Sequence, residues 1–140
     1  MLTRLVYASY SIATMDERLI QAILEESRAS NADFGITGVL CVDPSRDLFL
    51  QAIEGSRTAV NQLYANIIRD PRHTQVTLLH HEEISTRSFS AWRMGSIDLV
   101  KINPSVVLRF SETEHFHPIT TPGAAALALI QELTEGGVGG

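Results

Sequence analysis

The chain has 140 residues, a length that fits one domain with a short extension. Apolar residues make up 44% of the chain, which is enough for a packed core and excludes a disordered protein. The net charge of −5 argues against sequence-independent nucleic-acid binding, because such proteins need a basic surface.

The chain opens with a predicted strand and a predicted helix. Residues 2–9 are rich in β-forming side chains and form a short run, which predicts a strand. Apolar residues then recur at helical spacing over 15–29, and Asp16 or Thr14 is placed to cap the start of that helix.

A hairpin and a second helix are expected next. The apolar runs 35–42 and 48–53 flank a segment rich in proline and aspartate, which predicts a β-hairpin. Residues 57–69 carry an apolar stripe at helical spacing. This helix should end before Pro71, because proline disfavours helical geometry in the residue that precedes it.

Two further strands complete the predicted sheet. Residues 76–81 predict a fourth strand and residues 89–97 a fifth, although 87–89 also fit a helical turn. The element order βαββαββ contains two helical crossovers. It therefore predicts a ferredoxin-like α/β sandwich, in which a mixed sheet carries two helices on one face.

The C-terminal part reads differently from the rest. We expect a domain over 1–100 and an extension over 101–140, where prolines punctuate the chain. A short alanine-rich helix over 124–133 is expected there, followed by a flexible glycine-rich tail at 136–140.

Five short strings occur in order along the first 97 residues. They are Arg4-Leu5-Val6-Tyr7-Ala8-Ser9, Asn31 followed by Gly35-Ile36-Thr37-Gly38, Phe49-Leu50-Gln51-Ala52-Ile53-Glu54-Gly55, Asp70-Pro71-Arg72-His73 and Phe89-Ser90-Ala91-Trp92-Arg93-Met94-Gly95. In this order and spacing they resemble the BLUF family, the sensors of blue light that use a flavin, in its short single-domain type. The resemblance implies non-covalently bound FAD, with FMN or riboflavin as alternatives, and no enzymatic turnover.

Tyr7 and Gln51 match the photoactive pair of that family. From the sequence alone, Tyr7 is typical of a sheet tyrosine, and Gln51 of an outward-facing residue on a one-sided strand. The resemblance implies that Tyr7 donates an electron and a proton near the excited flavin, and that the amide of Gln51 switches. Trp92 and Met94 share a face of the last strand by alternation. The resemblance makes them the relay and leaves open which one faces the flavin.

Four further residues match contacts to the flavin ring. Asn31 is expected just after the first helix, where an asparagine also suits a helix end. The resemblance implies that Asn31 meets the pyrimidine end of the ring, and that Ser30 replaces a larger polar residue of other members. Ile23 and Ile67, which are otherwise typical core residues, match the apolar walls of the ring.

The loop after the second helix matches the neighbourhood of the ribityl chain and the phosphates. Asp70, Arg72 and His73 are typical of a solvated loop when taken alone. With the resemblance, Arg72 and His73 become charge-assisted donors to phosphate. They also allow an alternative function, a small ferredoxin-like hydrolase, and a light-insensitive interaction module of the same fold is a second alternative.

The remaining features concern location and partners. His115 and His117 lack a third ligand at metal spacing, so no metal site is expected. The single cysteine, Cys41, and the lack of signal-peptide features predict a cytoplasmic protein with no membrane partner. We expect a homo-oligomer through the apolar outer face of the sheet, and a downstream signalling protein of unknown identity.

Overall fold

The computed structural model describes residues 1–135, and the glycine-rich tail expected at 136–140 lies outside the described residues. Residues 1–135 form five strands and four α-helices. The strands are β1 (Leu2–Ser11), β2 (Thr37–Asp43), β3 (Leu48–Ser56), β4 (His73–Ile84) and β5 (Arg93–Asp98). The helices are α1 (Glu17–Phe34), α2 (Arg57–Arg69), α3 (Pro104–Leu108) and α4 (Gly123–Glu135), with 3-10 turns at Pro44–Arg46 and Leu99–Lys101.

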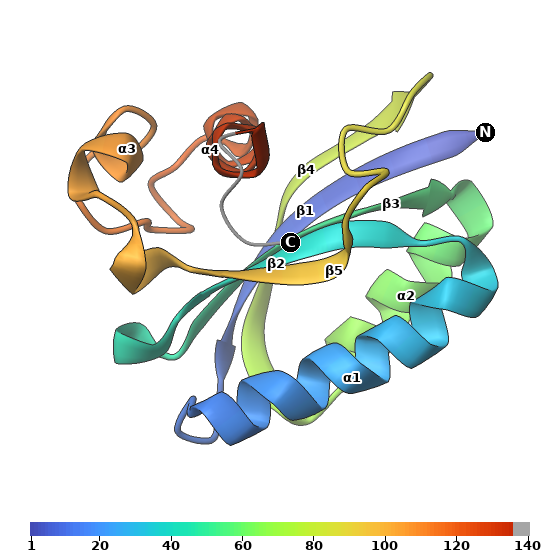
Figure 1. Cartoon of the computed structure of the whole chain (residues 1–140), viewed down its shortest axis with the longest axis horizontal. Helices are drawn as coiled ribbons and strands as arrows, with labels where there is room; N and C mark the ends of the chain where they lie inside the picture. The colour runs from blue at the N-terminus through green and yellow to red at the C-terminus, as the bar shows by residue number, and fades with distance from the viewer. Residues whose placement is uncertain (136–140) are drawn as a thin grey trace.

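The strands form one mixed sheet in the order β4-β1-β3-β2-β5. Neighbouring strands run antiparallel except β2 and β5, which are parallel. Helices α1 and α2 cover one face of the sheet, and α3 and α4 lie on the other (Figure 1). This arrangement confirms the predicted ferredoxin-like sandwich, with β5 added beside β2 at one edge.

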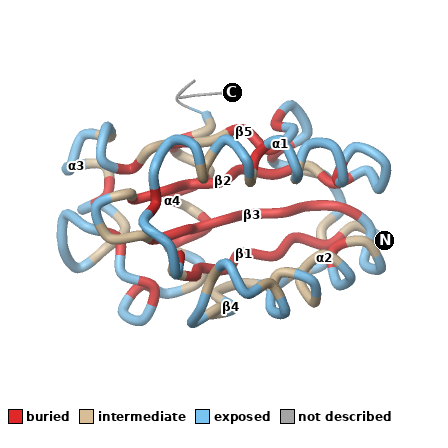
Figure 2. Tube along the Cα trace, turned by 90° about the horizontal axis from the view of Figure 1, so that it is seen from below, coloured by how far each residue is buried: buried red, intermediate tan, exposed pale blue. Residues whose placement is uncertain are grey.

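Side chains that alternate along the strands pack into two hydrophobic layers, one on each face of the sheet. The inner layer lies between the sheet and helices α1 and α2, and includes Leu5, Leu24 and Leu40. The outer layer lies on the opposite face and includes Val6 and Val39. The three central strands are buried along most of their length, whereas the helices and β4 present many exposed residues (Figure 2).

Helix α4 belongs to the outer layer and closes it. Ala126, Leu129 and Ile130 of this helix are fully buried against the sheet. The expected alanine-rich helix is therefore an integral part of the core. Helix α4 packs on the outer face through which we expected self-assembly, and self-assembly stays an untested prediction.

The first helix is longer than predicted. It continues to Phe34 and ends at Gly35, which adopts a left-handed φ of 68° and donates its N–H to the Asn31 carbonyl. Residues 30–34 contain neither glycine nor proline, so nothing in them stops the helix. The expectation that Asn31 follows the helix was wrong, because Asn31 lies within its last turns.

The last strand is shorter than predicted. It begins at Arg93, because residues 89–92 form a turn in which Trp92 N–H donates to the Phe89 carbonyl at 2.9 Å. Met94, the second residue of the strand, has a left-handed φ of 61°. This conformation interrupts the regular alternation of side chains at the start of β5.

Candidate functional site

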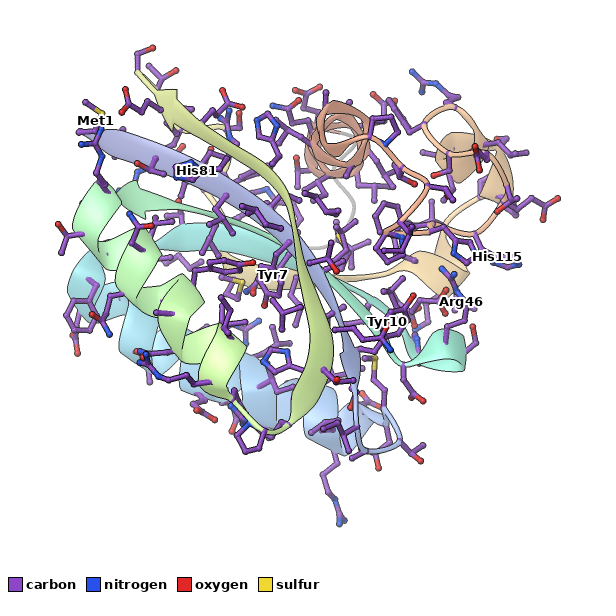
Figure 3. The ribbon with its side chains drawn as sticks, turned by 180° about the vertical axis from the view of Figure 1, so that it is seen from behind. Met1, Tyr7, Tyr10, Arg46, His81 and His115 are labelled. Carbon is purple, nitrogen blue, oxygen red and sulfur yellow. The ribbon has the colours of Figure 1, made fainter. Side chains whose placement is uncertain are left out.

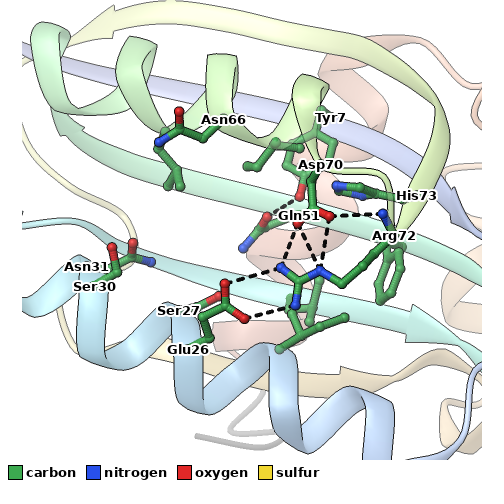
Figure 4. Close-up of a pocket in the computed structure, with 15 residues that line it drawn as sticks. Tyr7, Glu26, Ser27, Ser30, Asn31, Gln51, Asn66, Asp70, Arg72 and His73 are labelled. Atoms are coloured by element: carbon green, nitrogen blue, oxygen red, sulfur yellow. Dashed lines mark hydrogen bonds and ion pairs between the residues drawn. The ribbon is translucent and has the colours of Figure 1, made fainter.

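A cavity of about 180 Å³ opens between α1 and α2 on the inner face of the sheet. Most of the residues predicted from the sequence line it together, namely Tyr7, Ile23, Ser30, Asn31, Gln51, Ile67, Asp70, Arg72 and His73 (Figure 4). Trp92 and Met94 do not line it. The volume is below the range of about 300–1,000 Å³ typical of ligand pockets.

Tyr7 and Gln51 lie side by side at the floor of the cavity. The antiparallel register pairs Tyr7 on β1 with Gln51 on β3, so both side chains leave the same face of the sheet. Tyr7 points toward the side of the sheet that carries α1 and α2, away from Arg46 and His115 (Figure 3). Only 3% of Tyr7 and 6% of Gln51 is exposed. Gln51 thus faces the helices and not solvent.

A chain of hydrogen bonds runs from Tyr7 to Met94. The Tyr7 hydroxyl donates to Gln51 Oε1, and Gln51 Nε2 donates to Met94 Sδ at 2.9 Å. Burial, and the neighbouring Tyr64 and Asp70, raise the pKa of Tyr7 well above its ordinary value. The Tyr7 phenol therefore keeps its proton and acts as the donor, which orients the Gln51 amide.

Met94 and Trp92 face opposite sides of the sheet. Met94 belongs to the inner layer and reaches Gln51, whereas Trp92 belongs to the outer layer. The prediction that they share a face was wrong, because Trp92 precedes the strand and the left-handed φ of Met94 breaks the alternation. Met94 is thus the residue of the two that lies on the same side of the sheet as the cavity.

Arg28 and Gly38 both accommodate the conformation of Met94. Arg28 Nε of α1 donates to the Met94 carbonyl at 3.2 Å. The register between β2 and β5 shifts at Gly38, where a Cβ would overlap the Ala52 carbonyl oxygen and lie 3.0 Å from Met94 Cε. Gly38 therefore leaves the space that the Met94 side chain needs to reach Gln51.

Apolar walls and one unpaired amide shape the cavity. Ile23 on α1, with Ile67 and Leu63 on α2, lines it from the two helices. Asn31 is 5% exposed as a residue, and its side-chain amide, which makes no hydrogen bond to another of residues 1–135, keeps some contact with solvent at the cavity. The donors and the acceptor of this amide are therefore open to a ligand in the cavity. A flat apolar ring with a polar edge that both donates and accepts, such as a flavin, fits these residues.

Charged residues close the mouth of the cavity. Arg72 forms ion pairs with Asp70 at 2.6 Å and with Glu26 at 2.9 Å. The hydrogen bond from Arg72 holds the pKa of Asp70 below its ordinary value, although partial burial opposes this effect. Burial lowers the pKa of His73, whose Nδ1 lies 3.0 Å from Ser9 Oγ. Arg72 therefore carries the positive charge of the mouth at neutral pH.

Several lining residues were missed by the sequence-based prediction, namely Glu26, Ser27, Leu40, Phe49 and Leu63. Their spacing contained a usable signal. Glu26 and Ser27 follow Ile23 by three and four positions on α1, which is one helix face. Phe49 precedes Gln51 by two positions on β3, which is one sheet face.

Other chemistry has little support in the described chain. Ser9 and His73 form a pair, but Ser9 is fully buried and cannot meet a substrate. Burial raises the pKa of the Cys41 thiol to about 12, so this side chain is a protonated core residue. Within residues 1–135, no three potential ligands gather to hold a metal ion, and no helix is long and apolar enough to span a membrane.

Comparisons with known proteins agree with this geometry. The model of the family described as sensors of blue light using FAD matches residues 2–95. The chain is 38% identical over 96 residues to the photoactivated adenylate cyclase subunit beta of Euglena gracilis, and the alignment covers 68% of this chain and 11% of that protein. The chain thus spans about a tenth of the length of the first curated relatives it matches.

Solved structures of related proteins match nearly the whole chain, and two of them illustrate the likeness. BlsA in its photo-activated state superimposes with a TM-score of 0.80 at 30% identity, covering 95% of this chain and 94% of that one. BlrB in its dark state superimposes with a TM-score of 0.80 at 26% identity, covering 98% and 97%. The similarity to both extends beyond residue 95, where the family match ends.

Proposed function

The chain belongs to the BLUF family of flavin-binding blue-light sensors, and on this premise we propose that it binds FAD without a covalent bond and signals through Tyr7 and Gln51. The observation that supports this most is the hydrogen-bond chain from Tyr7 through Gln51 to Met94 at the floor of the cavity. FMN and riboflavin share the ring of FAD and are the alternative cofactors.

Different lining residues would contact different parts of a flavin. Ile23 and Ile67 would pack on the two faces of the ring, where burial of apolar area provides most of the binding energy. Asn31 would supply a donor and an acceptor to the pyrimidine end of the ring, and Ser30 lies next to it at the cavity. Asp70, Arg72 and His73 would meet the ribityl chain and the phosphates.

Tyr7 and Gln51 would carry the light response. A bound flavin absorbs blue light and, when excited, accepts an electron. Tyr7 would give an electron to the excited flavin and then pass its Oη proton to Gln51 Oε1, the atom to which it already donates a hydrogen bond. The raised pKa of Tyr7 keeps that proton on the phenol in the dark. After both return, the Gln51 amide would have rotated or tautomerised. Its changed hydrogen bonds would lower the energy of the flavin absorption, which is seen as a red shift.

We also propose that the signal passes to a separate protein. The family is one of sensors, and a sensor must pass its state to another domain or protein to have an effect. Met94 would be the first relay residue because it contacts Gln51 directly, and Trp92 would follow in the outer layer. A cytoplasmic location is consistent with the free, buried thiol of Cys41.

The colour of the protein tests this proposal. Purified protein should be yellow, and blue light should shift its main visible band to the red reversibly in a difference spectrum. Acid or heat denaturation should release the flavin, and chromatography should identify it as FAD. Failure to bind FAD on reconstitution would refute the proposal.

Gln51→Leu separates the switch from simple binding. Leucine is nearly the size of glutamine and lacks the amide, so the variant should fold and hold flavin through Ile23, Asn31 and Ile67. It should give no red shift. A normal red shift in this variant would remove Gln51 from the mechanism.

A further inference from the structure

The guanidinium of Arg72 spans the mouth of the cavity. Its Nε and Nη2 donate to the Asp70 carboxylate at 3.0 and 2.6 Å, and its Nη1 and Nη2 donate to the Glu26 carboxylate at 2.9 and 3.3 Å (Figure 4). Asp70 belongs to the same loop as Arg72, whereas Glu26 lies on α1. The Glu26–Arg72 pair therefore joins the two sides between which a flavin would enter.

Both carboxylates occupy the donors that a phosphate would need. All three nitrogens of Arg72 are engaged, so an anion can gain a two-pronged contact only if one carboxylate leaves. Asp70 also accepts the backbone N–H of Arg72 at 2.9 Å, which fixes it within the turn. Glu26 is the partner free to leave, since its side chain is 63% exposed and held to Arg72 from a separate helix.

We infer that Glu26 is a specificity residue that competes with the flavin phosphate for Arg72. The inference rests on the proposed function, in which Arg72 meets the phosphates. Glu26 lowers the affinity for phosphorylated flavins in two ways. It occupies the donors of Arg72, and after the phosphate has displaced it, its negative charge still repels the phosphate. Riboflavin, whose ribityl end carries no charge, does not meet this barrier. Removing the Glu26 charge should therefore favour FMN and FAD over riboflavin.

Riboflavin and FMN provide a matched pair, because they differ by one phosphate. Their dissociation constants can be measured on flavin-free protein at low salt by quenching of flavin fluorescence. We expect Glu26→Gln to raise the ratio of the riboflavin constant to the FMN constant about fivefold, the size of an exposed ion pair. The riboflavin constant itself should change by less than about twofold.

Glu25→Gln is the control, since Glu25 is an exposed residue of the same helix and the substitution removes the same charge. It should leave the ratio nearly unchanged. In an Arg72→Met background, Glu26→Gln should also lose its effect on the ratio, because the competition needs Arg72. The difference between Glu26→Gln and the parent in the ratio of the riboflavin constant to the FMN constant should become smaller in 1 M salt.

Two results would overturn the inference while leaving the proposed function intact. An equal rise in the ratio for Glu25→Gln and Glu26→Gln would mean that net charge alone acts. Equal changes in the riboflavin and FMN constants would mean that Glu26 does not sense the phosphate. If the parent protein binds none of riboflavin, FMN and FAD, the proposed function itself is refuted, and the inference with it.

Discussion

Tyr7→Phe isolates one hydroxyl in a fully packed position. The phenylalanine ring keeps the packing of Tyr7, including its contact with Tyr64, whose ring centre lies 5.8 Å away. The substitution removes the hydrogen bond to Gln51 Oε1 and leaves that oxygen buried without its donor. A lost hydrogen bond with a buried unpaired acceptor costs about 1–2 kcal/mol. Urea unfolding of the flavin-free protein should show a decrease of this size in the free energy of unfolding.

The light response of Tyr7→Phe should change far more than its stability. The variant should still bind flavin, because the walls Ile23 and Ile67 and the amide of Asn31 are untouched. It should form no red-shifted state, since the electron and proton donor is gone. Illumination followed by a difference spectrum measures this directly.

Tyr64→Phe is the matched control. Tyr64 is half-buried on α2, makes no side-chain hydrogen bond to another of residues 1–135, and loses the same hydroxyl. It should keep the red shift and nearly all of its stability. The reasoning would be refuted if Tyr7→Phe switched normally, or if both variants lost the red shift to the same extent.

Two further predictions concern the fold around the site. Gly38→Ala should lower the free energy of unfolding by about 1–3 kcal/mol in thermal melts, because its Cβ would overlap the Ala52 carbonyl oxygen. Gly55→Ala, whose Cβ would lie 3.2 Å from the nearest atom, should cost less. Burial lowers the pKa of His73 in the folded state, so the unfolded state binds its proton more readily. The contribution of His73 to the free energy of unfolding should be complete above its unfolded pKa of about 6.5 and should decline as the pH falls below that value. Unfolding measured from pH 7 to pH 5 should show this decline in the parent protein, and His73→Gln should remove it.

Local signals were sufficient to predict most of the fold. The second helix has the predicted bounds because Ser56 caps its start and Pro71 follows its end. Asp16 caps α1 as one of the two predicted candidates, by accepting the Leu19 N–H at 2.8 Å. Each of these features depends on residues within a few positions of one another, and the element order then restricts the sheet to few topologies.

Features that depend on distant contacts could not be predicted in the same way. The Arg72–Glu26 pair joins residues 46 positions apart, and neither residue carries a local sign of the other. Trp92 and Met94 face opposite sides of the sheet because Met94 has a positive φ. The prediction that they share a face assumed a regular strand, in which side chains alternate between the two faces. Space at Gly38 and the Arg28 contact to the Met94 carbonyl come from other elements, and they accommodate this conformation.

The same strained residue connects the two layers of the protein. Met94 contacts Gln51 in the inner layer, and two residues earlier Trp92 lies in the outer layer while its carbonyl accepts the Gly38 N–H at 2.9 Å. Just before this turn, Ser88 Oγ accepts a hydrogen bond from Gln131 of α4 at 3.3 Å. A change at the Gln51 amide would alter the contact that holds Met94 inward, and any shift of Met94 moves a chain segment that also packs on the outer face. On the proposed function, the signal therefore has a short physical route through the sheet, and α4 is where it would arrive.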